Sequence, residues 1–163
     1  MRWLEKEACG GKIYFYIALC LILDLAYSLT AVIVFNFLQI DIPMASKGGI
    51  PITFYIPFLL LFLAFLEELT FRMPLAFLSG VGLSTAKVLV FAIIFSVIFG
   101  FLHGGIPNIF IQGVGGFMYS VLFLKCGGLQ GNYTKAIATS TAVHFLFNMT
   151  LLAIAIISGG TSF

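Results

Sequence analysis

The chain contains few charged residues. Only 9% of its 163 residues are charged, whereas 61% are hydrophobic, and its mean hydropathy is +1.16. An ordinary soluble domain is about 25% charged and about 45–50% apolar. The shortage of charge therefore excludes a soluble globular domain and indicates a membrane protein.

Two further shortages narrow the possibilities. The formal net charge is only +2, too small and too spread out to suggest binding of nucleic acid. The three cysteines, Cys9, Cys20 and Cys126, are odd in number, far apart and without a CxxC spacing. The sequence therefore predicts neither a disulfide framework nor a zinc knuckle.

Long apolar runs, by contrast, are abundant. A membrane-spanning helix needs about 20 apolar residues. Continuous apolar runs also lack the alternation of barrel strands, so the expected fold is an all-α, multi-pass transmembrane helix bundle of about five spans. The polar stretches between runs are too short for a soluble domain, so residues 1–163 are predicted to form a single membrane domain. The expected spans are Ile13–Leu38, Ile52–Leu78, Ala86–Leu102, Ile106–Leu124 and Ala136–Ile157.

The first run predicts a retained span, because it is longer than the roughly 7–15 apolar residues of a cleaved signal and no small-residue cleavage site follows it. Lysine and arginine near span ends favour the cytoplasmic side. We therefore expect a protein of the cell membrane with a cytoplasmic amino terminus, an outward carboxyl terminus and only Lys47 outside. The residues expected inside are Arg2, Lys6, Lys12, Lys87, Lys125 and Lys135.

Several polar residues fall within the predicted spans. An ionisable side chain at the bilayer centre costs roughly 2.5 to 3.5 kcal/mol, so such groups are expected to face one another or a wet cavity. Asp24, alone in the first span, is expected to face the bundle interior unless it lies near an interface. The other polar residues, which come from three helices, are Glu67, Glu68, Arg72, His103, His144 and Asn148.

Helical spacing assigns some of these residues to shared faces. Glu68 and Arg72 are four residues apart, so they can form a buried ion pair. Glu67 is turned by about 100° from Glu68, which leaves it free of that pair. His144 and Asn148, again four residues apart, project together.

Three short motifs occur in order on three predicted helices. They are EELTFR (Glu67–Arg72), FGFLH (Phe99–His103) and HFLFN (His144–Asn148). Together they resemble the EExxxR, FxxxH and HxxxN motifs of the CAAX protease and bacteriocin-processing family of intramembrane glutamic proteases, also called the Abi family. The resemblance covers about Phe65 to Met149, and it implies a catalytic core at about residues 52–158 with the span at 13–38 as an added helix.

The resemblance implies hydrolysis of a peptide bond by a glutamate-activated water. A carboxylate in an apolar pocket can act as a general base near neutral pH. Glu67 would be the base and His103 would assist in proton transfer and in binding water. His144 and Asn148 would stabilise the oxyanion, while Glu68 and Arg72 would support the site. The sequence also allows Glu67 and Glu68 to exchange roles.

The sequence favours an enzyme without a metal or other cofactor. Two histidines and a glutamate could form a zinc site with an open position, which is the alternative. No HExxH motif accompanies the glutamates, however. The expected partner is a membrane-embedded protein or peptide substrate, and the oligomeric state is not predicted.

Two other functions remain alternatives. The chain could be a non-proteolytic immunity or scaffold member of the same family. Intramembrane carboxylates and histidines also build proton-coupled transporters, although transporters usually contain internal repeats and no repeat of the EELTFR segment is evident.

The depth of the motif residues sets a geometric condition. Glu67 lies near the middle of its predicted span, whereas His103 lies at the end of another. For the two to meet, the second span must tilt or break at Pro74, or the third must be shorter than its hydrophobic run. The cavity would then open toward the extracytoplasmic side. The glycine-rich segment Gly104–Gly116 predicts close approach of helices.

Overall fold

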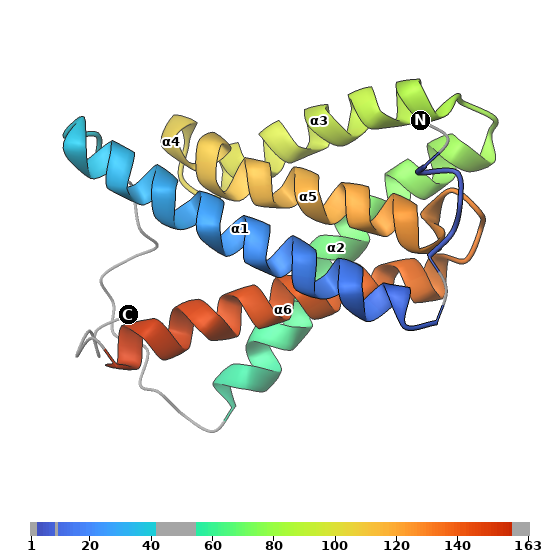
Figure 1. Cartoon of the computed structure of the whole chain (residues 1–163). Coiled ribbons are helices and arrows are strands. Elements are labelled where there is room, and N and C mark those ends of the chain that lie inside the picture. Colours follow the sequence, from blue (N-terminus) through green and yellow to red (C-terminus); the bar gives the residue numbers. More distant parts are fainter. Residues whose placement is uncertain (1–2, 9, 42–54, 158–163) are drawn as a thin grey trace.

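The computed structural model describes residues 3–8, 10–41 and 55–157. These residues form helices joined by short turns, with no strand among them, which confirms the predicted all-α class (Figure 1). The long helices are α1 (Lys12–Phe37), α2 (Ile56–Gly80), α3 (Thr85–Leu102) and α6 (Tyr133–Ile157). Between α3 and α6 the chain forms α4 (Ile106–Asn108), the π-helical turn η1 (Ile109–Gly113), α5 (Val114–Phe123) and a second π-helical turn, η2 (Leu124–Gly128).

Four of these helical segments are long and apolar enough to cross a membrane: α1, α3, the run from α4 to η2, and α6. Helix α2 is also long enough, with 25 residues, but it carries three ionisable side chains. Counting α2 gives about five spans, as predicted. The predicted start of the second span, at Ile52, lies outside the described residues.

The run from α4 to η2 is the central element of the bundle. In its most apolar stretch 61% of the residues are buried, against 22% in α1. It packs against α3 and α6, and α1 covers it from another side (Figure 1). The remaining face of α1 carries exposed apolar side chains, such as Ile22 and Leu29, which suit contact with lipid.

Glycines allow the central run to approach its neighbours closely. A Cβ atom on Gly100 of α3 would lie 2.7 Å from the Asn108 carbonyl oxygen and the Gly113 amide nitrogen. A Cβ on Gly116 would lie 3.0 Å from the Phe99 ring. These contacts confirm the prediction that the glycine-rich segment serves helix packing.

Helix α2 runs obliquely through the bundle (Figure 1) and packs against both α3 and α6. It continues through Pro74 without ending, up to Gly80. The break considered at Pro74 was therefore wrong, as was a shortened third span, because α3 extends to Leu102 as expected. The oblique path of α2 brings its middle to the end of α3.

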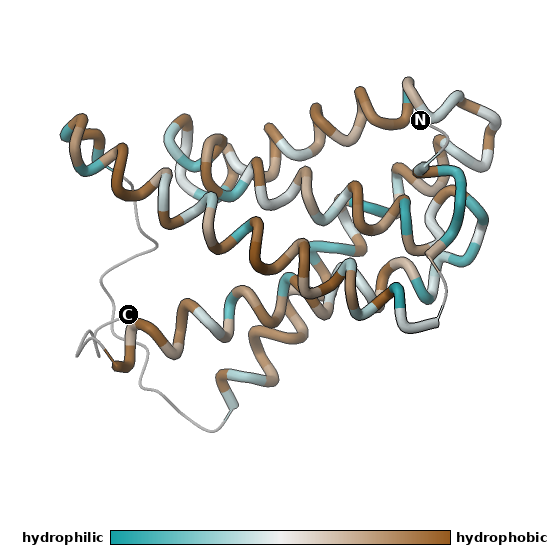
Figure 2. The backbone as a smooth tube through the Cα atoms, in the orientation of Figure 1, coloured by the Kyte–Doolittle hydropathy of each residue, from teal (hydrophilic) through white to brown (hydrophobic). Residues whose placement is uncertain are grey.

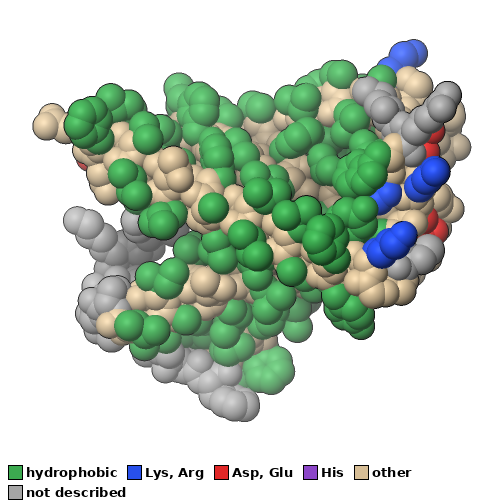
Figure 3. Space-filling model, in the orientation of Figure 1, with side chains coloured by type: hydrophobic (Ala, Val, Ile, Leu, Met, Phe, Trp, Pro, Cys, Tyr) green, Lys and Arg blue, Asp and Glu red, His purple; other side chains and the backbone are tan. Residues whose placement is uncertain are grey.

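Charged side chains gather at one end of the bundle. The amino-terminal segment lies there beside the end of η2 and the start of α6, as shown by the Ala8 N–H donating to the Lys125 carbonyl at 3.0 Å and by Lys135 pairing with Glu7 at 2.5 Å. Figure 2 shows hydrophilic chain at this end, on the right of the view, and Figure 3 shows lysine or arginine beside acidic side chains there. The lysines expected on the cytoplasmic side thus lie in elements that meet at one end. Arg2, expected on the same side, and Lys47, expected on the other, are outside the described residues.

Candidate active site

Glu68 and Arg72 form a fully buried ion pair within α2. Neither side chain is exposed, and Arg72 Nε lies 3.0 Å from Glu68 Oε2. Arg72 Nη2 also donates to Glu68 Oε1 at 3.2 Å, so the guanidinium lies within ion-pair distance of both carboxylate oxygens and hydrogen-bonds to one of them. These distances confirm the predicted ion pair, which forms because the two residues are one helical turn apart.

His144 of α6 contacts both glutamates through different nitrogens. Its Nδ1 lies 3.0 Å from Glu68 Oε1, within hydrogen-bonding distance. Its Nε2 lies 3.5 Å from Glu67 Oε2. Because an ionised carboxylate can only accept, Nδ1 is the donor to Glu68, and Nε2 is the nitrogen directed to Glu67.

His103, directly after the last residue of α3, approaches Glu67 from the other side. Its Nδ1 lies 2.7 Å from the carbonyl oxygen of Phe99, one turn earlier, and must be the donor because a carbonyl only accepts. Its Nε2 lies 3.8 Å from Glu67 Oε1. Each oxygen of Glu67 therefore faces the Nε2 atom of one histidine.

The two glutamates differ sharply in exposure. Glu68 is completely buried, whereas 32% of the Glu67 side chain and 32% of the His103 side chain are exposed. Successive helical residues point about 100° apart, so one side chain enters the core while the other reaches an accessible edge. Glu67 is the carboxylate that a substrate or water can reach.

The Phe99 ring separates the buried ion pair from the exposed edge. Its centroid lies 4.2 Å from the His103 ring and 6.0 Å from the His144 ring. The Arg72 guanidinium lies 5.8 Å from the same centroid, within the range of a cation–π contact. Phe99, the first residue of the FGFLH motif, thus packs against three polar side chains of the site: His103, His144 and Arg72.

Asn148 lies one turn beyond His144 on α6 and is half-buried. In the part of the chain that the structure describes, no hydrogen bond joins its side chain to the glutamates or histidines. The structure thus links five of the six predicted residues through direct contacts. The sixth, Asn148, shares a helical face with His144 alone. The described residues contain no group of three or more histidine, cysteine, aspartate or glutamate side chains arranged to hold a metal ion.

Asp24 faces the bundle interior, as expected, and only 1% of it is exposed. It accepts a hydrogen bond of 2.5 Å from the hydroxyl of Tyr119 in α5. The Tyr119 ring lies against that of His144, with centroids 5.1 Å apart and planes inclined by 30°. Tyr119 was not predicted from the sequence, because a single tyrosine in an apolar span does not indicate which polar residue its hydroxyl will contact.

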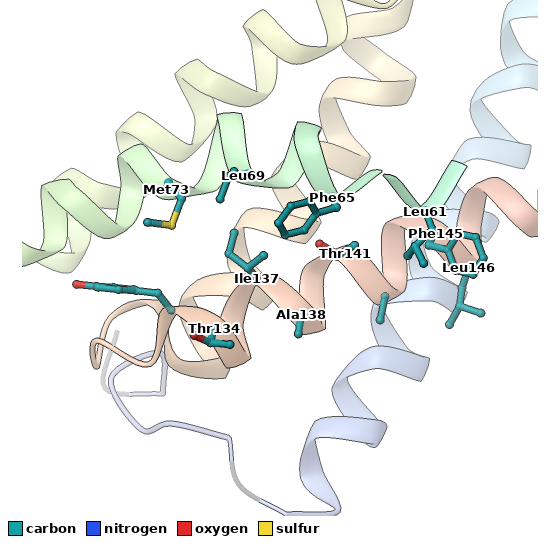
Figure 4. Close-up of a pocket in the computed structure, with 12 residues that line it drawn as sticks. Leu61, Phe65, Leu69, Met73, Thr134, Ile137, Ala138, Thr141, Phe145 and Leu146 are labelled. Carbon is teal, nitrogen blue, oxygen red and sulfur yellow. The ribbon is translucent and has the colours of Figure 1, made fainter. Parts of the chain in front are cut away.

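A separate apolar groove of about 760 Å³ lies between α2 and α6 (Figure 4). On α2 it is lined by Leu61, Phe65, Leu69 and Met73, each four residues from the next. Glu67 and His103 are not among its lining residues. The groove is therefore distinct from the glutamate and histidine cluster.

Comparison with known families identifies the class of protein. A family model described as Type II CAAX prenyl endopeptidase Rce1-like matches residues 49–150, well over half of the chain. The chain therefore belongs to this family of membrane-embedded peptidases, which in general have CAAX-type intramembrane protease activity. The match includes all three motifs and leaves α1 outside. No curated protein and no solved structure matches the chain.

Proposed function

We propose that the protein hydrolyses a peptide bond of a membrane-associated protein or peptide, using a water molecule activated by Glu67. The observation that carries this proposal is the contrast between the two glutamates. Arg72 and His144 engage both oxygens of Glu68, whereas Glu67 remains partly exposed between two histidine Nε2 atoms. A general base must be reachable and within one water of its substrate.

The spacing around Glu67 suits a shared water. Its two oxygens lie 3.5 and 3.8 Å from the histidine nitrogens, too far for strong direct hydrogen bonds but compatible with one bridging oxygen atom. Glu67 would take a proton from this water as its oxygen attacks the carbonyl carbon. The carbon–nitrogen bond would then break as the proton passes to the leaving nitrogen, with His103 assisting.

The tetrahedral intermediate needs hydrogen-bond donors at its oxyanion. Asn148 can supply an amide N–H from the helical face that it shares with His144. His144 can donate from Nε2 only as the doubly protonated imidazolium, since Nδ1 already donates to Glu68. The Glu68–Arg72 pair would keep His144 oriented without taking part in the reaction.

The substrate is proposed to be already lodged in the membrane, because the described chain has little mass outside its helices. Helix α3 begins beside Glu5, at the end of the bundle that holds Lys6, Lys125 and Lys135, called here the lysine-rich end. His103 follows the opposite end of α3. With the lysines cytoplasmic, the cleaved bond would lie toward the extracytoplasmic side.

The decisive experiment compares the termini of membrane proteins in cells that express the wild type, Glu67→Gln or His103→Ala. We expect new termini only with the wild type, while both variants accumulate in the membrane at normal levels. Thr70→Ala is the matched control, since the Thr70 side chain is exposed and donates a hydrogen bond to the Leu66 carbonyl of its own helix. Cleavage that persisted in both variants would refute the glutamate mechanism, and a folded wild type without any cleaved substrate would favour a non-proteolytic role.

A further inference from the structure

Helix α1 carries a buried carboxylate that the proposed reaction does not use. The buried residues of α1 are Cys20, Asp24 and Ser28, spaced four apart, so they form one stripe facing the bundle. An aspartate at membrane depth is costly and needs a compensating contact. The site that receives Asp24 therefore indicates what α1 contributes to this protein.

The receiving site on α5 is closely fitted to the carboxylate. The Tyr119 hydroxyl donates to Asp24 Oδ2, and only 3% of Tyr119 is exposed. One turn earlier, a Cβ atom on Gly115 would lie 2.9 Å from Asp24 Oδ1. Absence of a side chain at Gly115 is therefore what allows the carboxylate to reach the hydroxyl.

Tyr119 in turn lies against the His144 ring. The two ring centroids are 5.1 Å apart with planes inclined by 30°, whereas Phe99 meets His144 edge-on at 6.0 Å and 82°. Glu68 fixes one edge of the imidazole through Nδ1. The imidazole can still turn about its own Cβ–Cγ bond, and the Tyr119 ring lies where it limits that rotation.

We propose that Asp24 and Tyr119 form a positioning pair that holds the plane of the His144 ring so that Nε2 faces Glu67. Asp24 anchors the tyrosine hydroxyl, and the tyrosine ring supports the imidazole. Helix α1, outside the residues matched by the family model, thereby becomes part of the site. The effect on catalysis rests on the proposed protease function, but the effect on the ring does not.

The test uses the full chain labelled with ¹⁵N-histidine in lipid nanodiscs. The protein has only two histidines, so the ring signals can be assigned with His103→Ala. We expect Asp24→Asn and Tyr119→Phe each to shift or broaden the His144 ring signals and to leave those of His103 unchanged. Tyr119→Phe keeps the ring and removes only the hydroxyl, so it remains informative if Asp24→Asn fails to fold.

The second readout is the rate of peptide cleavage. The substrate is a peptide that spans a cleaved bond identified by the comparison of membrane-protein termini described above. Each variant is expected to lower kcat on the order of 10-fold with little change in KM, as for partners that orient a site residue. The double variant should be no worse than either single one, because both changes break the same contact. Cys20→Ala, one turn away on the same buried stripe, is the control for loosened packing and should leave both readouts unchanged.

Unchanged His144 signals in both single variants would overturn the positioning pair, as would equal shifts in Cys20→Ala. If the signals move as expected while Glu67→Gln still cleaves, the proposed reaction is wrong and the positioning pair stands. If the signals move but kcat does not, Asp24 and Tyr119 hold the ring without serving catalysis, and the catalytic part of the proposal is overturned.

Discussion

The charges inside the bundle and those at its lysine-rich end are held in different ways. Inside, Glu68 and Arg72 are completely buried, and the charge of each is compensated mainly by the other. At the end, the Glu7 and Lys135 side chains remain 26% and 23% exposed, and Lys135 also donates to the Ala8 carbonyl. A buried ion loses its hydration and depends on its partner, whereas a partly exposed ion retains water as an alternative. The interior should therefore be sensitive to single changes and the end tolerant.

The largest expected effect is on the rate of cleavage, and it should leave the stability of the bundle unchanged. Glu67→Gln should lower the rate of peptide cleavage by about 10²- to 10⁴-fold, the usual contribution of a general base. Its thermal unfolding in detergent should match the wild type, because Glu67 is partly exposed and outside the buried ion pair. A large loss of stability in this variant would mean that the two glutamates do not differ as described.

Arg72→Ala should have the largest effect on stability. Removing one partner of a buried ion pair typically costs about 3–5 kcal/mol, because the remaining charge is left without compensation. Denaturation in mixed micelles measures the loss. The double change Glu68→Gln with Arg72→Met should recover part of it, and a double variant as unstable as the single one would show that packing rather than charge governs this position.

Gly100→Ala should have an intermediate effect. The new methyl group would meet backbone atoms of the central run at 2.7 Å, so α3 must move away from η1. Overpacking of this kind typically costs about 1–3 kcal/mol. Since His103 follows α3, cleavage should fall as well, whereas Gly82→Ala, in the turn after α2 with φ of +85°, would alter stability without displacing His103.

The smallest effect is expected at the lysine-rich end. The hydrogen bond from Lys135 holds the pKa of Glu7 below its ordinary value of 4.5. Glu7 thus stabilises the fold above the ordinary pKa, and that contribution is lost as the pH falls through the lowered pKa of the folded state. Glu7→Gln should remove this acid-dependent part and cost below about 1 kcal/mol. Unfolding curves from pH 7 to pH 3 measure it, and a cost like that of Arg72→Ala would erase the contrast between the two regions.

Much of the bundle could be predicted from the sequence because its signals are local. The apolar runs placed the described ends of the spans within a few residues. The fourth run is continuous to Gly128, but its backbone leaves the helical region at Cys126 and Gly127, close to the end predicted at Leu124. The Glu68–Arg72 pair followed from a spacing within one helix. Of the alternatives that the depth of Glu67 allowed, the structure shows a tilt of the second span, since α2 runs obliquely and is continuous through Pro74.

That the protein is a helical membrane bundle, and which of its residues share a helical face, follows from the sequence alone, because hydrogen bonds within each helix set the 3.6-residue period. The helical period does not predict contacts between helices: that Glu67 meets His103 and His144 while Glu68 is enclosed, or that Asp24 reaches Tyr119. These contacts join helices far apart in the chain. They depend on the oblique path of α2 and on close approaches at Gly100 and Gly115, which only the packing of whole helices defines.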